Sequence, residues 1–245
     1  MAAMVAGALM AVTSAAQAAE IKVLGTPAVR EFYLELVAQF EQASGHKVTT
    51  EWAGTVDVMK RIGGGETVDL VIMAADSLDQ LAKRDKIVSD TRVNVAKSGV
   101  GVAVRAGAPK PDISSSDALK KTMLAAKSIA YSSGPSGVYI GELVQRMGVA
   151  DELKPKMRQI PPGEAVGELV ARGEAELGFH QISELLPVKG IEIVGPLSPD
   201  VQRITVFAAG LPPGAKEADA AQALVKFITA PAAAAVIKKH GMEPG

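Results

Sequence analysis

Residues 94–104 read NVAKSGVGVAV, an apolar run long enough to pass from one sheet into another. A second long apolar strand is predicted at residues 204–211. Around both runs, short β-branched segments alternate with longer segments of helical periodicity, which is typical of a mostly parallel sheet covered by helices. We therefore expect an α/β protein of two lobes, joined where the long strands cross.

The periodicity also predicts the extent of each lobe and its elements. The first lobe is expected to hold residues 20–98 and 191–245 and the second residues 99–190, with crossover hinge segments near 99–104 and 185–205. Strands are predicted at 21–24, 47–52, 69–73, 128–131 and 175–181. Helices are predicted from Pro27 to Gly45, through Val58 and Ile62, at 138–147 and 164–172, and on both sides of Pro231. Ser116 or Asp117 is expected to cap a helix that runs through Leu124.

The composition excludes several classes of function. The chain has 245 residues, and its 26 Lys and Arg against 27 Asp and Glu give a formal net charge of -1. Without a basic excess we expect no nucleic acid partner, and an aromatic content of 4% argues against a site built on stacking. Cysteine is absent, and the three histidines, His46, His180 and His240, are far apart in the sequence. We therefore expect no disulfide, no metal site and no cofactor.

Residues 1–19 are expected to form a secretory signal peptide. No charged side chain precedes Glu20, and the apolar run 2–12 is shorter than the ~20 residues that a membrane-spanning helix needs. The small residues at its end fit cleavage after Ala18 or Ala19, although the basic residue that usually opens such a segment is missing. We therefore expect a periplasmic mature chain.

The candidate binding residues lie in turns that join a strand to the next helix. The first N–H groups of a helix have no partner within it, and the helix dipole adds positive potential there, so such turns attract anions. Four turns rich in Gly, Ser, Thr or Pro occur at residues 26–28, 53–55, 132–137 and 181–183. Helix capping alone explains any single one of them. Four similar turns in two similar lobes favour a shared anionic ligand in a cleft between the lobes.

Several motifs, taken in order, resemble the molybdate-binding protein family, the type II periplasmic receptors that serve ABC importers. They are DLVI at 69–72, GVY at 137–139 and GEAELGF at 173–179. The likeness is closer to a branch that carries GVGVAV at 99–104, PKPDIS at 109–114 and ISE at 182–184. The resemblance, which runs from Ile21 to about Gly241, implies the two-lobed type II periplasmic binding protein fold. It also implies a monomeric receptor that works with an ABC permease of the inner membrane.

The resemblance further implies which residues contact the ligand. The family's oxyanion contacts fall on Ala28, Thr55, Ser136 and Gln181. Ala28 replaces a serine and Gln181 a tyrosine of the family pattern, so the pocket is expected to differ chemically from a molybdate site. Turns and resemblance together nominate Thr26, Ala28, Arg30, Gly54, Thr55, Ser133, Ser136, Gly137 and Gln181 as ligand-binding residues.

Arg30 bears on the kind of anion. It lies one turn into the first helix, from where its guanidinium would reach a carboxylate with two hydrogen bonds. An organic acid becomes the favoured ligand if Arg30 faces the cleft. A surface position with pairing to Glu31 or Glu35 is the alternative.

Three functions remain open at this point. The favoured one is a solute receptor, not an enzyme, that closes two lobes on a molybdate-like oxyanion or a small organic carboxylate. The second is a hydrolase-like enzyme using Ser136 or His180, although the G-x-S-x-G spacing is absent and His180 is expected to be a structural, hydrogen-bonded residue. The third, an effector-sensing half of a transcription regulator, conflicts with the secretory segment and the absence of a helix-turn-helix block.

Overall fold

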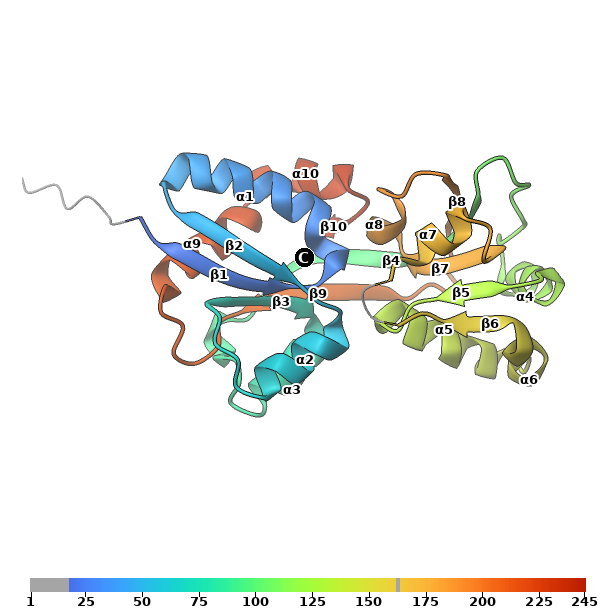
Figure 1. The fold of residues 1–245 in the computed structure, drawn as a ribbon, viewed down its shortest axis with the longest axis horizontal. Coiled ribbons are helices and arrows are strands. Elements are labelled where there is room, and N and C mark those ends of the chain that lie inside the picture. The colour runs from blue at the N-terminus through green and yellow to red at the C-terminus, as the bar shows by residue number, and fades with distance from the viewer. Residues whose placement is uncertain (1–17, 162–163) are drawn as a thin grey trace, which may run out of the picture.

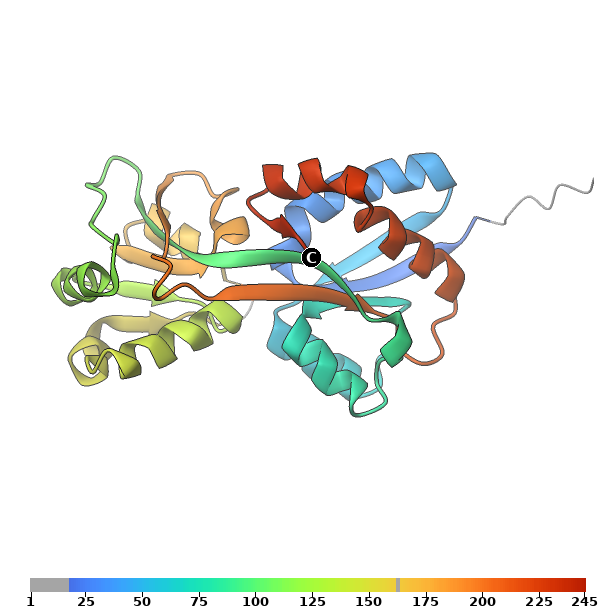
Figure 2. The same ribbon diagram turned by 180° about the vertical axis from the view of Figure 1, so that it is seen from behind.

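The computed structural model describes residues 18–161 and 164–245. The expected signal peptide therefore lies outside the described residues, apart from Ala18 and Ala19. The described chain forms two lobes, each with helices on both faces of its part of the sheet, and the long strands β4 and β9 run side by side between them (Figures 1 and 2). This arrangement confirms the two-lobed α/β fold expected from the sequence.

The first lobe contains the N-terminal and C-terminal parts of the chain. Its strands are β1 (Glu20–Gly25), β2 (Lys47–Trp52), β3 (Leu70–Ala74), β9 (Ile204–Gly210) and β10 (Glu243–Pro244). Its helices are α1 (Arg30–Ser44), α2 (Thr55–Gly63), α3 (Ala75–Ala82), α9 (Ala218–Ile228) and α10 (Ala234–Lys239), with short 3-10 turns η1 (Pro27–Val29), η2 (Ser89–Thr91) and η4 (Pro231–Ala233).

The second lobe is built from the middle of the chain. Its strands are β5 (Ile129–Tyr131), β6 (Met157–Gln159), β7 (Leu177–Gln181) and β8 (Ile191–Pro196). Its helices are α4 (Ser116–Ala125), α5 (Pro135–Arg146), α6 (Ala150–Leu153), α7 (Val166–Ala171) and α8 (Ile182–Leu185), with the 3-10 turn η3 (Lys154–Lys156).

Strand β4 (Val93–Arg105) is shared by the two lobes. Its first half pairs with β9 as far as Gly99, and its second half pairs with β7 and β8 from Val100 onward. At this change of partner the side chain of Gln202 holds both backbone groups of Val100: its Oε1 accepts from the Val100 N–H at 2.9 Å, and its Nε2 donates to the carbonyl at 3.1 Å. The ten strands thus form one continuous sheet rather than two separate ones.

The sheet contains parallel strands within each lobe and antiparallel pairs where the crossing strands join them. Strand β1 pairs in parallel with β2 and β3, and β5 pairs in parallel with β6 and β7, as βα units require. The crossing strands β4 and β9 add antiparallel pairs to both groups.

The cores follow the predicted helical faces. In α1 the buried side chains are Phe32, Tyr33, Leu36, Val37 and Phe40, which pack on the first-lobe sheet. The helix ends where expected, because Gly45 takes a left-handed conformation (φ 76°) and donates its N–H to the Glu41 carbonyl. A separate core that includes Leu119, Ile140 and Phe179 fills the second lobe.

Two expectations need adjustment. The helix cap is Ser115, whose Oγ accepts from the Ala118 N–H at 3.2 Å, so the prediction of Ser116 or Asp117 as the cap was wrong by one or two positions. Strand β8 pairs with the second-lobe half of β4, and Leu197 and Val201 join the second-lobe core. We therefore propose that the second lobe extends to about residue 203 rather than ending at 190.

Within residues 18–161 and 164–245, no helix alone is both long and apolar enough to cross a bilayer. Helix α9 and the segment Pro231–Lys239 reach the necessary length and apolar character only as a pair, which is bent by 55°.

Asp69 connects three segments of the first lobe and supplies a test of the fold. Its buried carboxylate accepts hydrogen bonds from the backbone N–H groups of Lys22 (2.8 Å), Lys216 (2.8 Å) and Glu217 (3.0 Å). Replacing Asp69 with Ala leaves these donors without an acceptor and is expected to lower the free energy of unfolding by about 3 kcal/mol in urea titrations. The control is Asp79→Ala, which removes a half-exposed partner of Arg92 and should cost less than about 1 kcal/mol. Equal losses in the two variants would show that Asp69 does not connect these segments.

Candidate functional site

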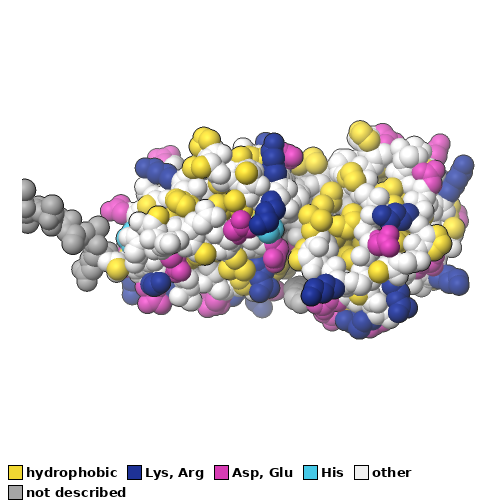
Figure 3. Space-filling model, turned by 90° about the horizontal axis from the view of Figure 1, so that it is seen from above, with side chains coloured by type: hydrophobic (Ala, Val, Ile, Leu, Met, Phe, Trp, Pro, Cys, Tyr) yellow, Lys and Arg dark blue, Asp and Glu magenta, His cyan; other side chains and the backbone are white. Residues whose placement is uncertain are grey.

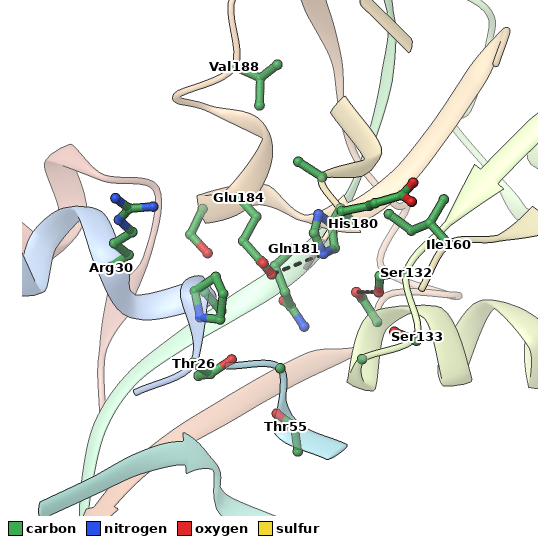
Figure 4. Close-up of a pocket in the computed structure, with 18 of the residues that line it drawn as sticks. Thr26, Arg30, Thr55, Ser132, Ser133, Ile160, His180, Gln181, Glu184 and Val188 are labelled. Atoms are coloured by element: carbon green, nitrogen blue, oxygen red, sulfur yellow. Dashed lines mark hydrogen bonds and ion pairs between the residues drawn. The ribbon is translucent and has the colours of Figure 1, made fainter. Parts of the chain in front are cut away.

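A cavity of about 630 Å³ lies between the two lobes. Residues from strand ends and helix starts of both lobes line it, as the sequence predicted. Thr26 and Thr55 of the first lobe and Ser132 and Ser133 of the second border the same space (Figure 4). Of the nine nominated residues, all except Gly137 line this cavity.

The first-lobe wall is formed by the loop after β1 and the start of α2. The backbone N–H of Thr26 donates to the Ile72 carbonyl at 2.9 Å, so this amide is already used within the sheet, while the residue still faces the cavity. Gly54 precedes α2 in an extended conformation and provides no side-chain cap. Thr55 follows it with its Oγ1 buried and without a hydrogen-bond partner among the described residues.

The second-lobe wall begins at the turn before α5. Ser132 and Ser136 are buried, and their hydroxyl oxygens lie 3.0 Å apart. Gly137 lies behind this pair: its N–H donates to the Gly134 carbonyl, and a Cβ at this position would lie 1.6 Å from the Ser132 carbonyl oxygen. Gly137 therefore shapes the turn, and its nomination as a residue facing the ligand is not matched by its position.

Gln181 lies at the end of β7, where the two lobes meet. Its Nε2 donates to Thr205 Oγ1 on β9 at 2.8 Å, and its Oε1 is buried with no partner among the residues the structure describes. A buried polar atom without a partner costs about 1–3 kcal/mol. Thr55 Oγ1 and Gln181 Oε1 are two such atoms in the wall of one cavity, and a polar ligand would recover that cost.

The sequence reasoning missed Glu184 as a site residue and underrated His180. Both line the cavity, with His180 Nε2 3.2 Å from Glu184 Oε2, and the Glu184 carboxylate extends toward the centre of the site (Figure 4). Burial raises the pKa of the Glu184 carboxyl, and the adjacent His180 offsets part of that rise. The four-residue spacing across the end of β7 was the available signal, because a strand end followed by a helical turn brings such residues together.

Arg30 stands at the exposed rim of the cavity. Its guanidinium lies 5.9 Å from the centre of the Trp52 ring, and no carboxylate in the described part of the chain is within ion-pair distance of it. The alternative of pairing with Glu35 was wrong, since that carboxylate binds Lys239 (2.8 Å) and His240 (2.9 Å), which lower its pKa. Arg30 is thus left available to an anion.

Two other chemistries find no support here. Within 18–161 and 164–245, no three His, Asp or Glu residues are grouped so that they could hold a metal ion. The hydrogen-bond partner of the Ser136 hydroxyl is Ser132 rather than an imidazole, so the hydrolase alternative has no activated nucleophile at this position. Basic and acidic side chains are interspersed on the face of the molecule in Figure 3.

Comparisons with known proteins give matches over nearly the whole chain. The model of a family described as bacterial extracellular solute-binding protein matches residues 21–243. An aconitate isomerase from a Pseudomonas species is 36% identical over 230 residues, which is 91% of this chain and 87% of that protein. The molybdate-binding protein of Azotobacter vinelandii is 30% identical over 237 residues, covering 93% and 91% of the two chains.

A solved structure shows the same fold. The periplasmic molybdate-binding protein of Azotobacter vinelandii superimposes with a TM-score of 0.75 at 21% identity, covering 92% of this chain and 99% of that one. The expected resemblance to molybdate receptors and the type II periplasmic binding protein fold are therefore confirmed.

The turn before α5 generates a prediction about Gly137. Gly137→Ala forces a methyl group against the Ser132 backbone and is expected to lower the free energy of unfolding by about 1–3 kcal/mol in urea titrations. Gly141→Ala is the matched control in the same helix, where an added Cβ meets nothing within 4 Å. That substitution should stabilise the protein by about 0.5–1 kcal/mol through helix propensity. A stable Gly137→Ala variant would contradict the tight packing described for this turn.

Proposed function

This chain is a member of the bacterial extracellular solute-binding proteins, and from that premise we propose that its inter-lobe cleft binds a small organic polycarboxylate. The observation that carries the proposal is Arg30 at the rim of the cavity with no ion-pair partner among the described residues. A guanidinium offers two parallel N–H donors, which match the two oxygens of a carboxylate.

The size of the cavity supports the same choice. Its volume of about 630 Å³ lies within the about 300–1,000 Å³ that sites for small organic molecules occupy. A tetrahedral oxyanion is much smaller and would touch few of these walls at once. A ligand with three carboxylates on a short carbon chain offers several anionic groups to the helix starts of both lobes, which line the same cavity.

The comparisons support a polycarboxylate in a different way. The relative named aconitate isomerase acts on a six-carbon tricarboxylate, and it is 36% identical to this chain against 30% for the molybdate-binding protein. The positions Ala28 and Gln181, where the serine and tyrosine of the molybdate pattern are replaced, line the cavity. We take these departures as adaptation of the same cleft to another anion.

Helix-start donors supply enough free energy for such a ligand. One charge-assisted hydrogen bond contributes about 1.5–3 kcal/mol, and micromolar affinity requires about 8 kcal/mol. Four or five bonds to the carboxylates therefore suffice, provided that closure excludes water.

In the physiological setting that we propose, the protein is a periplasmic receptor. It binds the carboxylate between its lobes and presents the closed form to an ABC permease of the inner membrane. The hinge at β4 and β9 supplies the two states, and the ligand favours the closed one because it contacts both lobes only there.

The ligand class is tested by calorimetric titration of the purified protein. We expect cis-aconitate, trans-aconitate or tricarballylate to bind about 10- to 100-fold more tightly than molybdate, tungstate or sulfate, the difference made by one charge-assisted hydrogen bond. Tighter binding of molybdate than of every carboxylate would refute the proposal.

The position of the site is tested by Thr55→Val, which keeps the side-chain shape and removes the unpartnered hydroxyl. Affinity for the best carboxylate should fall about 10-fold or more, while stability of the ligand-free protein stays equal or rises, because no hydrogen bond is lost. Unchanged affinity would show that the ligand does not contact the start of α2.

A second function, isomerisation of the bound tricarboxylate, is favoured by a specific observation. Glu184 and His180 form an acid–base pair inside the cavity, a feature that anion binding alone does not need, and the relative at 36% identity is named for such a reaction. The solute-binding fold and an enzymatic activity are compatible, because function depends on the site rather than on the fold.

Isomerisation is tested by incubating catalytic amounts of the protein with cis-aconitate and separating the isomers by chromatography. We expect the trans isomer to accumulate over many turnovers per protein molecule, faster than in heat-denatured protein. Tight binding of cis-aconitate without any conversion would leave the receptor function and exclude the isomerase.

A further inference from the structure

Glu184 is placed unusually for a cleft that binds anions. It lies on α8, directly after β7, with its side chain about one-fifth exposed and its carboxylate extending into the cavity (Figure 4). An ionised carboxylate there repels a negatively charged ligand and weakens binding. Glu184 therefore lowers the affinity of a receptor for an anion, and its position suggests a role other than binding.

The contact with His180 holds the Glu184 carboxylate in place. His180 Nε2 lies 3.2 Å from Oε2, whereas His180 Nδ1 is buried and has no hydrogen-bond partner in the described part of the chain. A proton on Nδ1 would have no acceptor, so the tautomer with hydrogen on Nε2 is favoured, and this hydrogen faces the carboxylate. The contact uses only Oε2 of the carboxylate, which leaves Oε1 for a ligand in the cavity.

The surroundings of the pair suit a reaction that builds negative charge on a bound ligand. The helix starts of α2 and α5 border the same cavity from opposite lobes and present positive potential to it. Fixed dipoles of this kind stabilise charge that develops during a reaction without having to reorient. Burial raises the pKa of the Glu184 carboxyl, which strengthens it as a base.

We propose, building on the carboxylate binding and isomerisation set out above, that Glu184 is the catalytic residue that carries a proton between two carbons of a bound unsaturated tricarboxylate. His180 is the positioning residue that orients its carboxylate. In the first step the methylene C–H bond breaks, an O–H bond forms on Glu184, and the electron pair spreads over the three-carbon unit and its carboxylates. In the second step the Glu184 carboxyl gives the proton to the far carbon of that unit, and the double bond moves.

The two steps balance without any other reactant. The substrate loses and regains one proton, Glu184 ends as the carboxylate it began as, and nothing is oxidised or reduced. The new double bond joins the former methylene carbon to the central carbon, so its cis or trans geometry is set by the conformation about that single bond when the first proton leaves.

The step is tested with cis-aconitate that carries two deuterium atoms on its methylene carbon, added to the full protein. The trans product is expected to keep only one deuterium on that carbon, which has become part of the double bond, as read by NMR. A trans product that keeps both deuterium atoms on an intact methylene group would overturn the proposal. Absence of any conversion would overturn it as well, while calorimetric binding of cis-aconitate would keep the receptor function intact.

The residue assignment is tested with Glu184→Gln. The isomerisation rate should fall at least about 100-fold, as expected for loss of a general base, while cis-aconitate binds at least as tightly as to the wild type, because the variant no longer places a negative charge beside the ligand. Glu184→Asp, which keeps the carboxylate but withdraws it by one methylene group, should retain an intermediate rate. A wild-type rate in Glu184→Gln would assign the proton transfer to another group.

The control is Glu35→Gln, because Glu35 also pairs with a histidine, His240, at 2.9 Å but lies outside the cavity. Its rate should stay within twofold of the wild type. For the positioning role, His180→Gln should lower kcat about tenfold with KM and melting temperature unchanged, whereas His180→Leu should lower kcat further. If both variants instead lose kcat to the same extent and both melt at a lower temperature, His180 has a structural role and does not position Glu184.

Discussion

The first N–H groups of a helix have no partner within that helix, and this chain repeatedly places helix starts at the ends of strands that face the gap between its lobes. The starts of α2 and α5 and the loop after β1 meet at one cavity. Thr55 Oγ1 and Gln181 Oε1 lie unpartnered in the same walls. The site therefore contains polar groups that a ligand can satisfy, and the anion binding that we propose rests on backbone geometry rather than on a cluster of cations.

Much of the fold could be predicted because local periodicity and core packing agree. The apolar stripe of α1 and the glycine that ends it were visible in the sequence, and the length of β4 predicted that it crosses between the lobes. The pairing of β8 could not be read in the same way. Its partner is set by the tertiary path of the chain, and a short strand of half-buried residues carries no signal of which lobe it joins.

Which residues line the cavity could be predicted where a single turn determines the direction that a residue faces, whereas their role in ligand binding stays a prediction. Thr26, Gly54 and Thr55 line the cavity because each immediately precedes or begins a helix, and Ser133 lies in the turn two residues before α5. Gly137 lies one residue too far along α5 and turns inward, which depends on a close approach to Ser132 that sequence spacing does not reveal. Glu184 was missed because a charged residue on a short helix is usually solvated, and only the three-dimensional path shows it beside His180.

The continuity of β4 has a mechanical consequence. Strand pairing is continuous from β2 through β4 to β6. Movement of one lobe against the other therefore bends a hydrogen-bonded sheet rather than rotating the lobes about flexible linkers. The side chain of Gln202 bonds the backbone of β4 at Val100, where β4 changes from one partner strand to the next. In the closure that we propose, the approach of the two lobes has to bend this shared sheet, and opening of the cleft on release of the ligand lets the sheet relax.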